Sequence, residues 1–166
     1  MELRSFDIRP FTAPDYQLCA QIYAEGIATG HATFETEVPT WSAWDQKYSR
    51  SCRLVCTLAG QVVGWAALTP FSNREVYKGV AEISIYMSTQ VSGKGYATAL
   101  LNALVRCSEK QGFWSLLAKI FPENEASVKI HLKNGFRIVG TLDRIGMRDG
   151  KWHDNLLLQR GSTTAT

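Results

Sequence analysis

The sequence lacks any long apolar run, and none of its 166 residues lie in a stretch near the roughly 20 apolar residues of a membrane-spanning helix. Its start, MELRSFDIRP, also lacks the apolar core of a secretory signal. We therefore expect a cytoplasmic protein without membrane contact. An excess of one charge is absent too, because 18 Lys and Arg face 15 Asp and Glu. The net charge of +3 is too small and too scattered to indicate nucleic-acid binding.

Cysteine is sparse and shows no metal-binding pattern. No second pair of Cys or His completes a zinc spacing around Cys52 and Cys56, so we expect no metal site. Disulfides are rare in a reducing compartment, where cysteines usually serve as small buried apolar residues. We predict that state for Cys19, Cys52, Cys56 and Cys107.

What is present is the composition of an ordinary globular domain. Apolar residues make up 45% of the chain and charged residues 20%, and the length fits one domain with a sizeable core. We assign residues 1–160 to this domain. The polar tail 161–166 is expected to be disordered.

Hydrophobic periods of two and of 3.6 residues alternate along the chain. Strands are predicted at 3–10, 53–58, 62–71, 80–87, 115–121, 136–144 and 151–159. Helices are predicted to follow Thr12, to span 40–50, to run from the glycine loop near 95 to Gly112, and to run from Asn124 to Asn134. Gly26 and Gly30 mark the end of the first helix. This order predicts an α/β domain with a mixed sheet.

The stretch 80–104 carries the strongest pattern. Residues 80–87 alternate as a strand, with Glu82, Ser84 and Tyr86 on one face. A polar loop with two glycines follows, and helical spacing begins directly after it. This order directs free backbone N–H groups and a helix dipole toward one spot, which suits a pyrophosphate.

The glycine loop fits neither common nucleotide motif. It has no Gly-Lys followed by Ser or Thr, as a P-loop requires, and a dinucleotide fingerprint would need glycine where Thr98 stands. Gly93-Lys94-Gly95 resembles instead the acyl-CoA loop of the GCN5-related N-acetyltransferases, the GNAT family, with the motif Gln/Arg-x-x-Gly-x-Gly/Ala. In this alignment Ser92 takes the place of the Gln or Arg.

A second family signature lies at 124–136, NEASVKIHLKNGF, although Leu132 and Asn134 replace the frequent Glu and Leu. Four separated segments further resemble the phosphinothricin and methionine sulfoximine acetyltransferases of this family. They are ATFET at 32–36, VAEISIYMS around Glu82, NEASVKIH at 124–131 and GKWHD at 150–154.

The resemblance spans about residues 8–160 and implies the single-domain GNAT fold. In that fold a mixed central sheet is flanked by helices, and its strands are splayed at the acetyl-CoA site. The group uses acetyl-CoA to acetylate the amino group of small amino-acid-like substrates such as phosphinothricin, methionine sulfoximine or methionine sulfone. The resemblance also implies a homodimer.

Cofactor contacts are implied for the strand end, the glycine loop and the last helix start. The strand end and Asn124 would contact the pantetheine arm, and the loop N–H groups would bind the pyrophosphate. Asn124 also suits an ordinary helix N-cap, which is compatible with that role. The full set is Ile85, Tyr86, Met87, Gly93, Lys94, Gly95, Tyr96, Ala97, Thr98, Asn124 and Ser127.

Three residues are candidates for catalysis. Glu82 is the candidate general base, because an amine with a pKa of ~8 is mostly protonated at neutral pH. The alternative is a solvated strand residue. His131 falls where many family members have a tyrosine that protonates the leaving thiolate, and a surface histidine without that role is the alternative. Tyr86 is another possible donor.

The acceptor contacts are predicted on three segments. Arg74 and Lys78 can hold a carboxylate or phosphinate, unless they are only solvated loop charges. Phe34 and Glu35 can form the opposite wall. The resemblance places His153 at the site from across a dimer interface.

Two other functions stay open. The same fold and cofactor can serve another amine, such as a polyamine or a protein N-terminus, although the positive charges of Arg74 and Lys78 oppose a polycation. A CoA-binding module without turnover is the other function, and Ser92 in the glycine loop is the feature that favours it.

Overall fold

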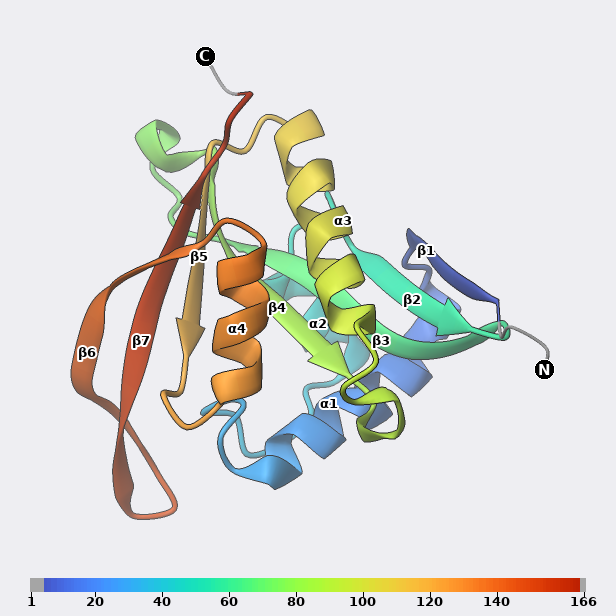
Figure 1. The fold of residues 1–166 in the computed structure, drawn as a ribbon, viewed down its shortest axis with the longest axis horizontal. Coiled ribbons are helices and arrows are strands. Elements are labelled where there is room, and N and C mark those ends of the chain that lie inside the picture. Colours follow the sequence, from blue (N-terminus) through green and yellow to red (C-terminus); the bar gives the residue numbers. More distant parts are fainter. Residues whose placement is uncertain (1–4, 165–166) are drawn as a thin grey trace.

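The computed structural model describes residues 5–164, and over this range the chain folds into one mixed sheet with helices on both faces (Figure 1). The predicted α/β domain is confirmed. The helices are α1 (Tyr16–Thr29), α2 (Trp41–Lys47), α3 (Tyr96–Lys110) and α4 (Glu125–Lys133). The strands are β1 (Phe6–Pro10), β2 (Leu54–Leu58), β3 (Gln61–Pro70), β4 (Val80–Met87), β5 (Ser115–Ile120), β6 (Arg137–Arg148) and β7 (Lys151–Gly161).

The strand order is β1-β2-β3-β4-β5-β7-β6, which puts β4 in the centre and β6 at one edge. All neighbours are antiparallel except β4 and β5. α3 provides the crossover between these two parallel strands, as parallel pairing requires. Among the described residues no helix is long and apolar enough to cross a membrane.

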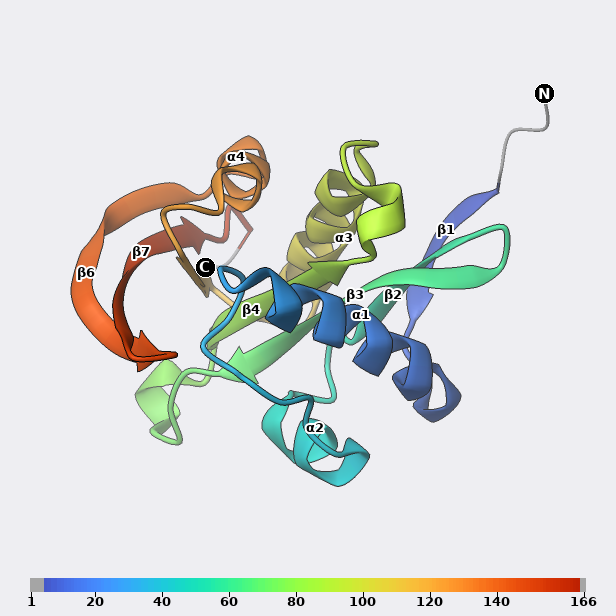
Figure 2. The same cartoon turned by 90° about the horizontal axis from the view of Figure 1, so that it is seen from below.

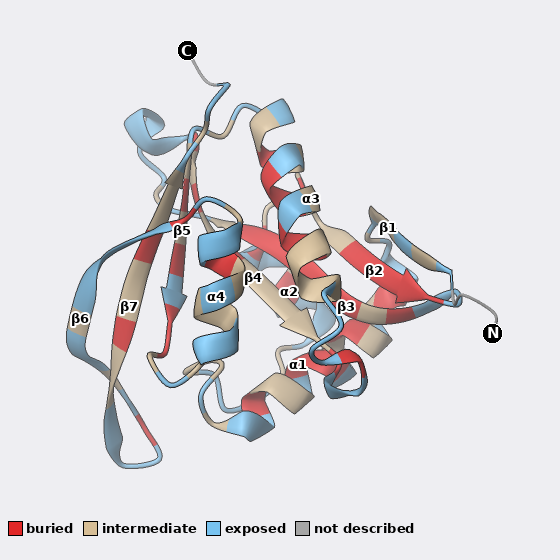
Figure 3. Ribbon diagram, viewed as in Figure 1, coloured by how far each residue is buried: buried red, intermediate tan, exposed pale blue. Residues whose placement is uncertain are grey.

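Two apolar layers hold the helices to the sheet. α1 and α2 cover one face, and α3 and α4 cover the other (Figure 2). Leu100, Leu101 and Leu104 of α3 are fully buried, and each stabilises the fold by roughly 1.5–3 kcal/mol through burial. Figure 3 shows the buried residues concentrated along the central strands and the inner side of α3.

The predicted alternation of β4 is confirmed by this layering. Ala81 and Ile83 lie in the core under α3, whereas Tyr86 packs against the core under α1 and α2. Glu82 shares the face of Tyr86 because side chains alternate along a strand.

The central strands part soon after they meet. The β4–β5 ladder runs only from Val80↔Ser115 to Glu82↔Leu117. β4 then continues to Met87 beside β3 alone, and β5 continues beside β7 alone. The predicted splaying of the sheet therefore begins directly after Glu82.

The first helix ends later than one of its two glycines suggested. Gly26 lies inside α1, and the helix ends at Gly30, which adopts φ +79°. A Cβ on Gly26 would stand 2.8 Å from Cδ1 of Tyr86. Glycine is therefore needed at position 26 for close packing, not for a turn.

The C-terminal hairpin is longer than predicted. β6 extends to Arg148 and turns through Asp149 and Gly150, as expected. Gly161, which was assigned to a disordered tail, pairs with Ser115 as the last residue of β7. The beginning of the predicted first strand, 3–4, and the end of the tail, 165–166, lie outside the described residues.

The expectation of four unpaired cysteines is wrong. Cys52 and Cys107 form a disulfide with their Cα atoms 5.7 Å apart. The two are 55 positions apart, and they meet because α3 packs over the start of β2, a tertiary contact without a local sequence signal. Cys19 and Cys56 are free and buried, as predicted, and burial raises the pKa of each thiol to about 12.

We predict that the disulfide contributes measurably to stability. Closing a loop of this length stabilises a fold by up to about 4 kcal/mol in the chain-entropy account, so reduction should lower the free energy of unfolding by about 2–4 kcal/mol. Urea denaturation with and without dithiothreitol measures this change. A Cys52→Ala/Cys107→Ala variant is the control, because reductant should not shift its transition. Thiol titration of unfolded, unreduced protein should find two thiols, and four would contradict the pairing.

Candidate active site

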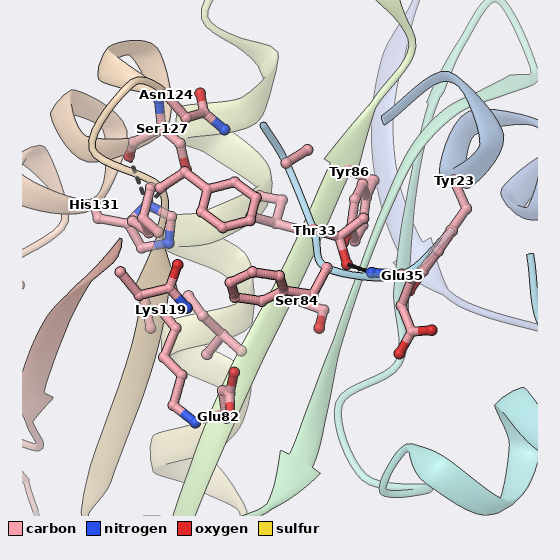
Figure 4. Close-up of a pocket in the computed structure, with 18 of the residues that line it drawn as sticks. Tyr23, Thr33, Glu35, Glu82, Ser84, Tyr86, Lys119, Asn124, Ser127 and His131 are labelled. Carbon is pink, nitrogen blue, oxygen red and sulfur yellow. Dashed lines mark hydrogen bonds and ion pairs between the residues drawn. The ribbon is translucent and has the colours of Figure 1, made fainter. Parts of the chain in front are cut away.

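The gap between β4 and β5 opens into a cavity of about 350 Å³, a volume typical of small-molecule sites. It passes through the sheet and is lined from both layers (Figure 4). Ser127 and His131 of α4 and the residue before this helix, Asn124, stand on one side, and Tyr86 and Tyr23 stand across the cavity from them.

Backbone groups form the polar wall of this gap. Strand residues direct alternate N–H and C=O groups to either side. Since β4 beyond Glu82 pairs only with β3, and β5 beyond Leu117 only with β7, the inner edges of both strands carry groups without a ladder partner in the range 5–164. An extended chain that contains amides can pair with such an edge. Ile85 and Tyr86 line the cavity at this edge.

The glycine loop lies outside the cavity lining, between the end of β4 and α3. Gly93 and Gly95 adopt φ values of +75° and +83°, which side chains other than glycine rarely accept. The first helical bond runs from the N–H of Ala99 to the carbonyl of Gly95, at 3.3 Å. The N–H groups just before Ala99 are therefore free for an anion, and the first turn carries no acidic residue.

The side chains of this loop region differ in what they can offer. The ring of Tyr96 stacks on Phe6 with centroids 4.7 Å apart. Lys94 lines a separate hollow beside α1. Met87 lies at the end of β4 and, like Gly93, Gly95, Ala97 and Thr98, is not part of the cavity lining.

The register of the loop motif needs a correction. In Gln/Arg-x-x-Gly-x-Gly/Ala the first position stands three residues before the first glycine. With Gly93 and Gly95 as the glycines, that position is Gln90. The chain therefore has the family's glutamine, and the departure assigned to Ser92 is wrong. Gln90 belongs to a 3-10 turn, Thr89–Val91, directly before the loop.

The start of α4 is capped as predicted. Oδ1 of Asn124 accepts the N–H of Ser127 at 3.3 Å. The carboxamide nitrogen of Asn124 keeps two N–H groups for a ligand in the cavity that this residue lines. The cap and the predicted cofactor contact are thus compatible.

His131 is buried against the cavity, with 2% of its surface exposed, and is not a helix-surface residue. Its Nδ1 lies 2.6 Å from the carbonyl oxygen of Ser127. A carbonyl only accepts, so Nδ1 carries the proton and Nε2 of the neutral ring is an acceptor. Burial lowers the pKa of His131, against the opposing effect of the Ser127 carbonyl, so the ring is neutral at pH 7.

Glu82 is the last residue of β4 that pairs with β5, and the two strands part beyond it. Its Oε2 lies 3.7 Å from Nζ of Lys119 on β5, and both side chains line the cavity. Figure 4 shows the two charged groups together at one end of the cavity, apart from His131. The structure therefore supplies a carboxylate and a neutral imidazole to the same cavity.

Aromatic side chains form the wall on the α1 side. Tyr86 stacks on Trp65 with centroids 5.0 Å apart and contacts Tyr23 at 4.7 Å. The hydroxyl of Tyr48 donates to Oγ of Ser84 at 3.3 Å. Burial raises the pKa of Tyr86, as it does for Tyr23 and Tyr48, so these phenols stay protonated and can donate hydrogen bonds.

The predicted acceptor residues fall into two groups. Phe34 and Glu35 line the cavity, and His153 lies beside it in the same chain, with its ring 6.0 Å from that of Phe34. Arg74 and Lys78 are not in the lining. The guanidinium of Arg74 lies over the ring of Tyr77, and Lys78 pairs with Glu75 at 2.9 Å. An anion clamp at these two cations stays a prediction.

Among the polar residues of the cavity that sequence reasoning missed are Tyr48, Lys119 and Asn155. Lys119 had a signal, because it is the one charged residue in the apolar strand SLLAKI. Asn155 is a lone amide beside Leu156–Leu158 of β7 and is buried. Tyr48 had none, since only the fold brings its hydroxyl to Ser84.

Comparisons with known proteins show what this chain is similar to. The sequence model of the acetyltransferase (GNAT) domain family matches residues 6–137. The chain is 33% identical over 163 residues to a phosphinothricin N-acetyltransferase of Streptomyces viridochromogenes, which covers 96% of this chain and 89% of the relative. It is 34% identical over 101 residues to an L-methionine sulfoximine/L-methionine sulfone acetyltransferase of Pseudomonas aeruginosa, covering 61% and 59% of the two chains.

Solved structures show the same architecture. A GNAT superfamily phosphinothricin acetyltransferase from Sinorhizobium meliloti, in complex with acetyl-CoA, superposes with a TM-score of 0.85 at 29% identity, covering 97% of this chain and 90% of that one. The family match, the two enzyme relatives and this shared architecture agree with one another. The chain belongs to the GNAT family of acetyltransferases, which use acetyl-CoA to acetylate an amine.

Proposed function

We propose that this enzyme acetylates the amino group of a small amino-acid-like compound such as phosphinothricin, methionine sulfoximine or methionine sulfone. The observation that carries the proposal is the cavity through the sheet. Glu82 stands on its α1 and α2 side, and α4 borders its other side. The activities for which the two enzyme relatives are named support this class of acceptor.

The chain's own groups bind the cofactor along one line. The N–H groups of residues 93–98 hold the pyrophosphate, the open edge of β4 at Ile85 and Tyr86 pairs with the pantetheine amides, and Asn124 adds its carboxamide. Ser127 fixes His131 through its carbonyl. Acetyl-CoA supplies an acetyl thioester, which can acylate an amine once the amine has lost a proton.

Glu82 is the base that removes this first proton. The carboxylate is partly exposed at the parting of the strands, so an ammonium group or an intervening water can reach it. The amine that results attacks the thioester carbonyl, and general-base help of this kind typically accelerates a reaction by ~10²–10⁴-fold.

His131 and Tyr86 handle the protons that remain. Because Nε2 of neutral His131 is an acceptor, the ring has to take a proton from the nitrogen of the tetrahedral intermediate before it can give one to the leaving thiolate. Tyr86 keeps its proton, and its hydroxyl can stabilise the thiolate by a hydrogen bond. We therefore assign proton transfer to His131 and hydrogen-bond donation to Tyr86.

A homodimer is the proposed assembly. The edge strand β6 exposes a row of large apolar side chains, which are Ile138, Val139, Ile145 and Met147. The neighbouring strand β7 exposes Trp152. Exposed apolar residues on an edge strand favour pairing with another chain. His153 lies two positions from Asn155 on the same hairpin, so such pairing would bring the second copy close to the site. The cytoplasmic location stays a prediction.

We expect free thiol to be released from acetyl-CoA only when a suitable amine is present. A panel of phosphinothricin, methionine sulfoximine, methionine sulfone, spermidine and an alanine-terminated peptide tests the acceptor class. The three amino-acid-like compounds should give turnover well above the acceptor-free background. Turnover restricted to spermidine or the peptide would reassign the acceptor, and no turnover with any amine would favour a binding module.

Glu82→Gln should keep the fold and the affinity for acetyl-CoA but lower kcat by about 10²–10⁴-fold at neutral pH. The rate of the variant should continue to rise with pH, because free amine accumulates around its pKa of ~8 and replaces part of the lost function. Steady-state rates from pH 6 to 10 and calorimetric titration with acetyl-CoA measure both effects. A folded variant within a few-fold of the wild-type kcat would remove Glu82 from the mechanism.

Light scattering should give twice the 18.5 kDa mass of one chain. Val139→Glu places a charge in the exposed row on β6 and should shift the mass toward that of one chain. Val76→Glu is the matched control, because Val76 is equally an exposed valine but lies in the turn Glu75–Tyr77 and not on β6, so its substitution should leave the mass unchanged. A monomeric wild type, or a dimer in both variants, would contradict pairing through β6.

A further inference from the structure

Lys119 is an unusual residue for its place in the fold. β5 lies inside the sheet between β4 and β7, and its other residues are apolar except for Ser115 at the start. Leu116, Ala118 and Ile120 belong to the core under α3, so Lys119 projects from the opposite face. That face also carries Glu82, and it is the side of the cavity bordered by Glu35, Lys47 and Tyr48.

The ion pair with Glu82 gives Lys119 little structural value. Its Nζ lies 3.7 Å from Oε2 of Glu82, and the two side chains are 44% and 38% exposed. Pairs this open contribute a median of only about 0–1 kcal/mol to stability. A charged residue on an inner strand therefore needs another reason, and both partners line the cavity.

Glu82 and Lys119 together form a dipole of one carboxylate and one ammonium at the end of the cavity. An α-amino acid is a dipole of the same kind, since its ammonium and carboxylate are attached to one carbon. When the acceptor lies head to tail with the Glu82–Lys119 pair, its ammonium faces Glu82 and its carboxylate faces Lys119. Each charge then meets its opposite, and the amine stands beside the group that takes its proton.

We propose that Lys119 binds the α-carboxylate of the acceptor and so selects free α-amino acids over amines that lack this group. The inference deepens the proposed function and rests on it. Lys119 also disfavours polyamines, because a second cationic group on the acceptor would meet a like charge at this position. Lys119 is a specificity residue and takes no part in bond making.

The experiment compares L-methionine sulfone with its α-carboxamide as acceptors. The wild type should show a higher kcat/KM for the acid. Lys119→Met roughly keeps the length of the side chain but removes the charge. The ratio of kcat/KM for the acid to kcat/KM for the amide should then fall about 10–100-fold, the usual range for a lost charge-assisted hydrogen bond. The change should lie in KM for the acid. Lys119→Arg should retain most of the preference.

Lys129→Met is the matched control, because Lys129 is exposed on α4 and does not line the cavity. The acid-to-amide ratio of kcat/KM in Lys129→Met should equal that of the wild type. Equal losses of kcat for acid and amide in Lys119→Met would mean that Lys119 only orients Glu82, and the proposal would be overturned. An unchanged ratio would overturn it as well. A wild type that acetylates neither compound but does acetylate another amine would remove the proposed acceptor class, and this inference with it.

Discussion

The parting of β4 from β5 is the constraint on which the site depends. Both strands keep their other neighbour, so the sheet loses only the ladder bonds between them, beyond Glu82↔Leu117. The backbone groups released in this way face a cavity and not the core, where unpaired groups would cost about 1–3 kcal/mol each. The gap thus turns the middle of a stable sheet into a polar slot that is open to both layers.

The two helix layers bring different groups to this slot. α3 and α4 bring the glycine loop, Asn124 and His131 to one face, and α1 and α2 border the face that carries Glu82 and Lys119. In the proposed function, cofactor and acceptor approach from these opposite sides and meet in the gap. The disulfide between Cys52 and Cys107 links α3 to the segment just before β2 and so holds α3 to the sheet.

Local patterns predicted the elements well, and contacts between distant residues account for what they missed. The period of two gave β4 its observed bounds, and the glycine loop gave the start of α3. The role of Gly26 was misinterpreted, because glycine is needed there to make room for the ring of Tyr86. The disulfide was missed because its two cysteines are 55 positions apart. For His131 the family resemblance predicted a catalytic role, but only the fold shows its burial and its bond to Ser127. Lys119, a charge in an apolar strand, lines the cavity, so such a charge was a usable signal for the cavity lining.

The measurement that tests the central claim most directly is a crystal structure of the enzyme with acetyl-CoA. The account predicts pyrophosphate on the N–H groups of residues 93–98, pantetheine amides paired with the open edge of β4, and the acetyl group in the cavity between Glu82 and His131. A cofactor bound elsewhere on the surface, with β4 and β5 paired along their full length, would contradict it.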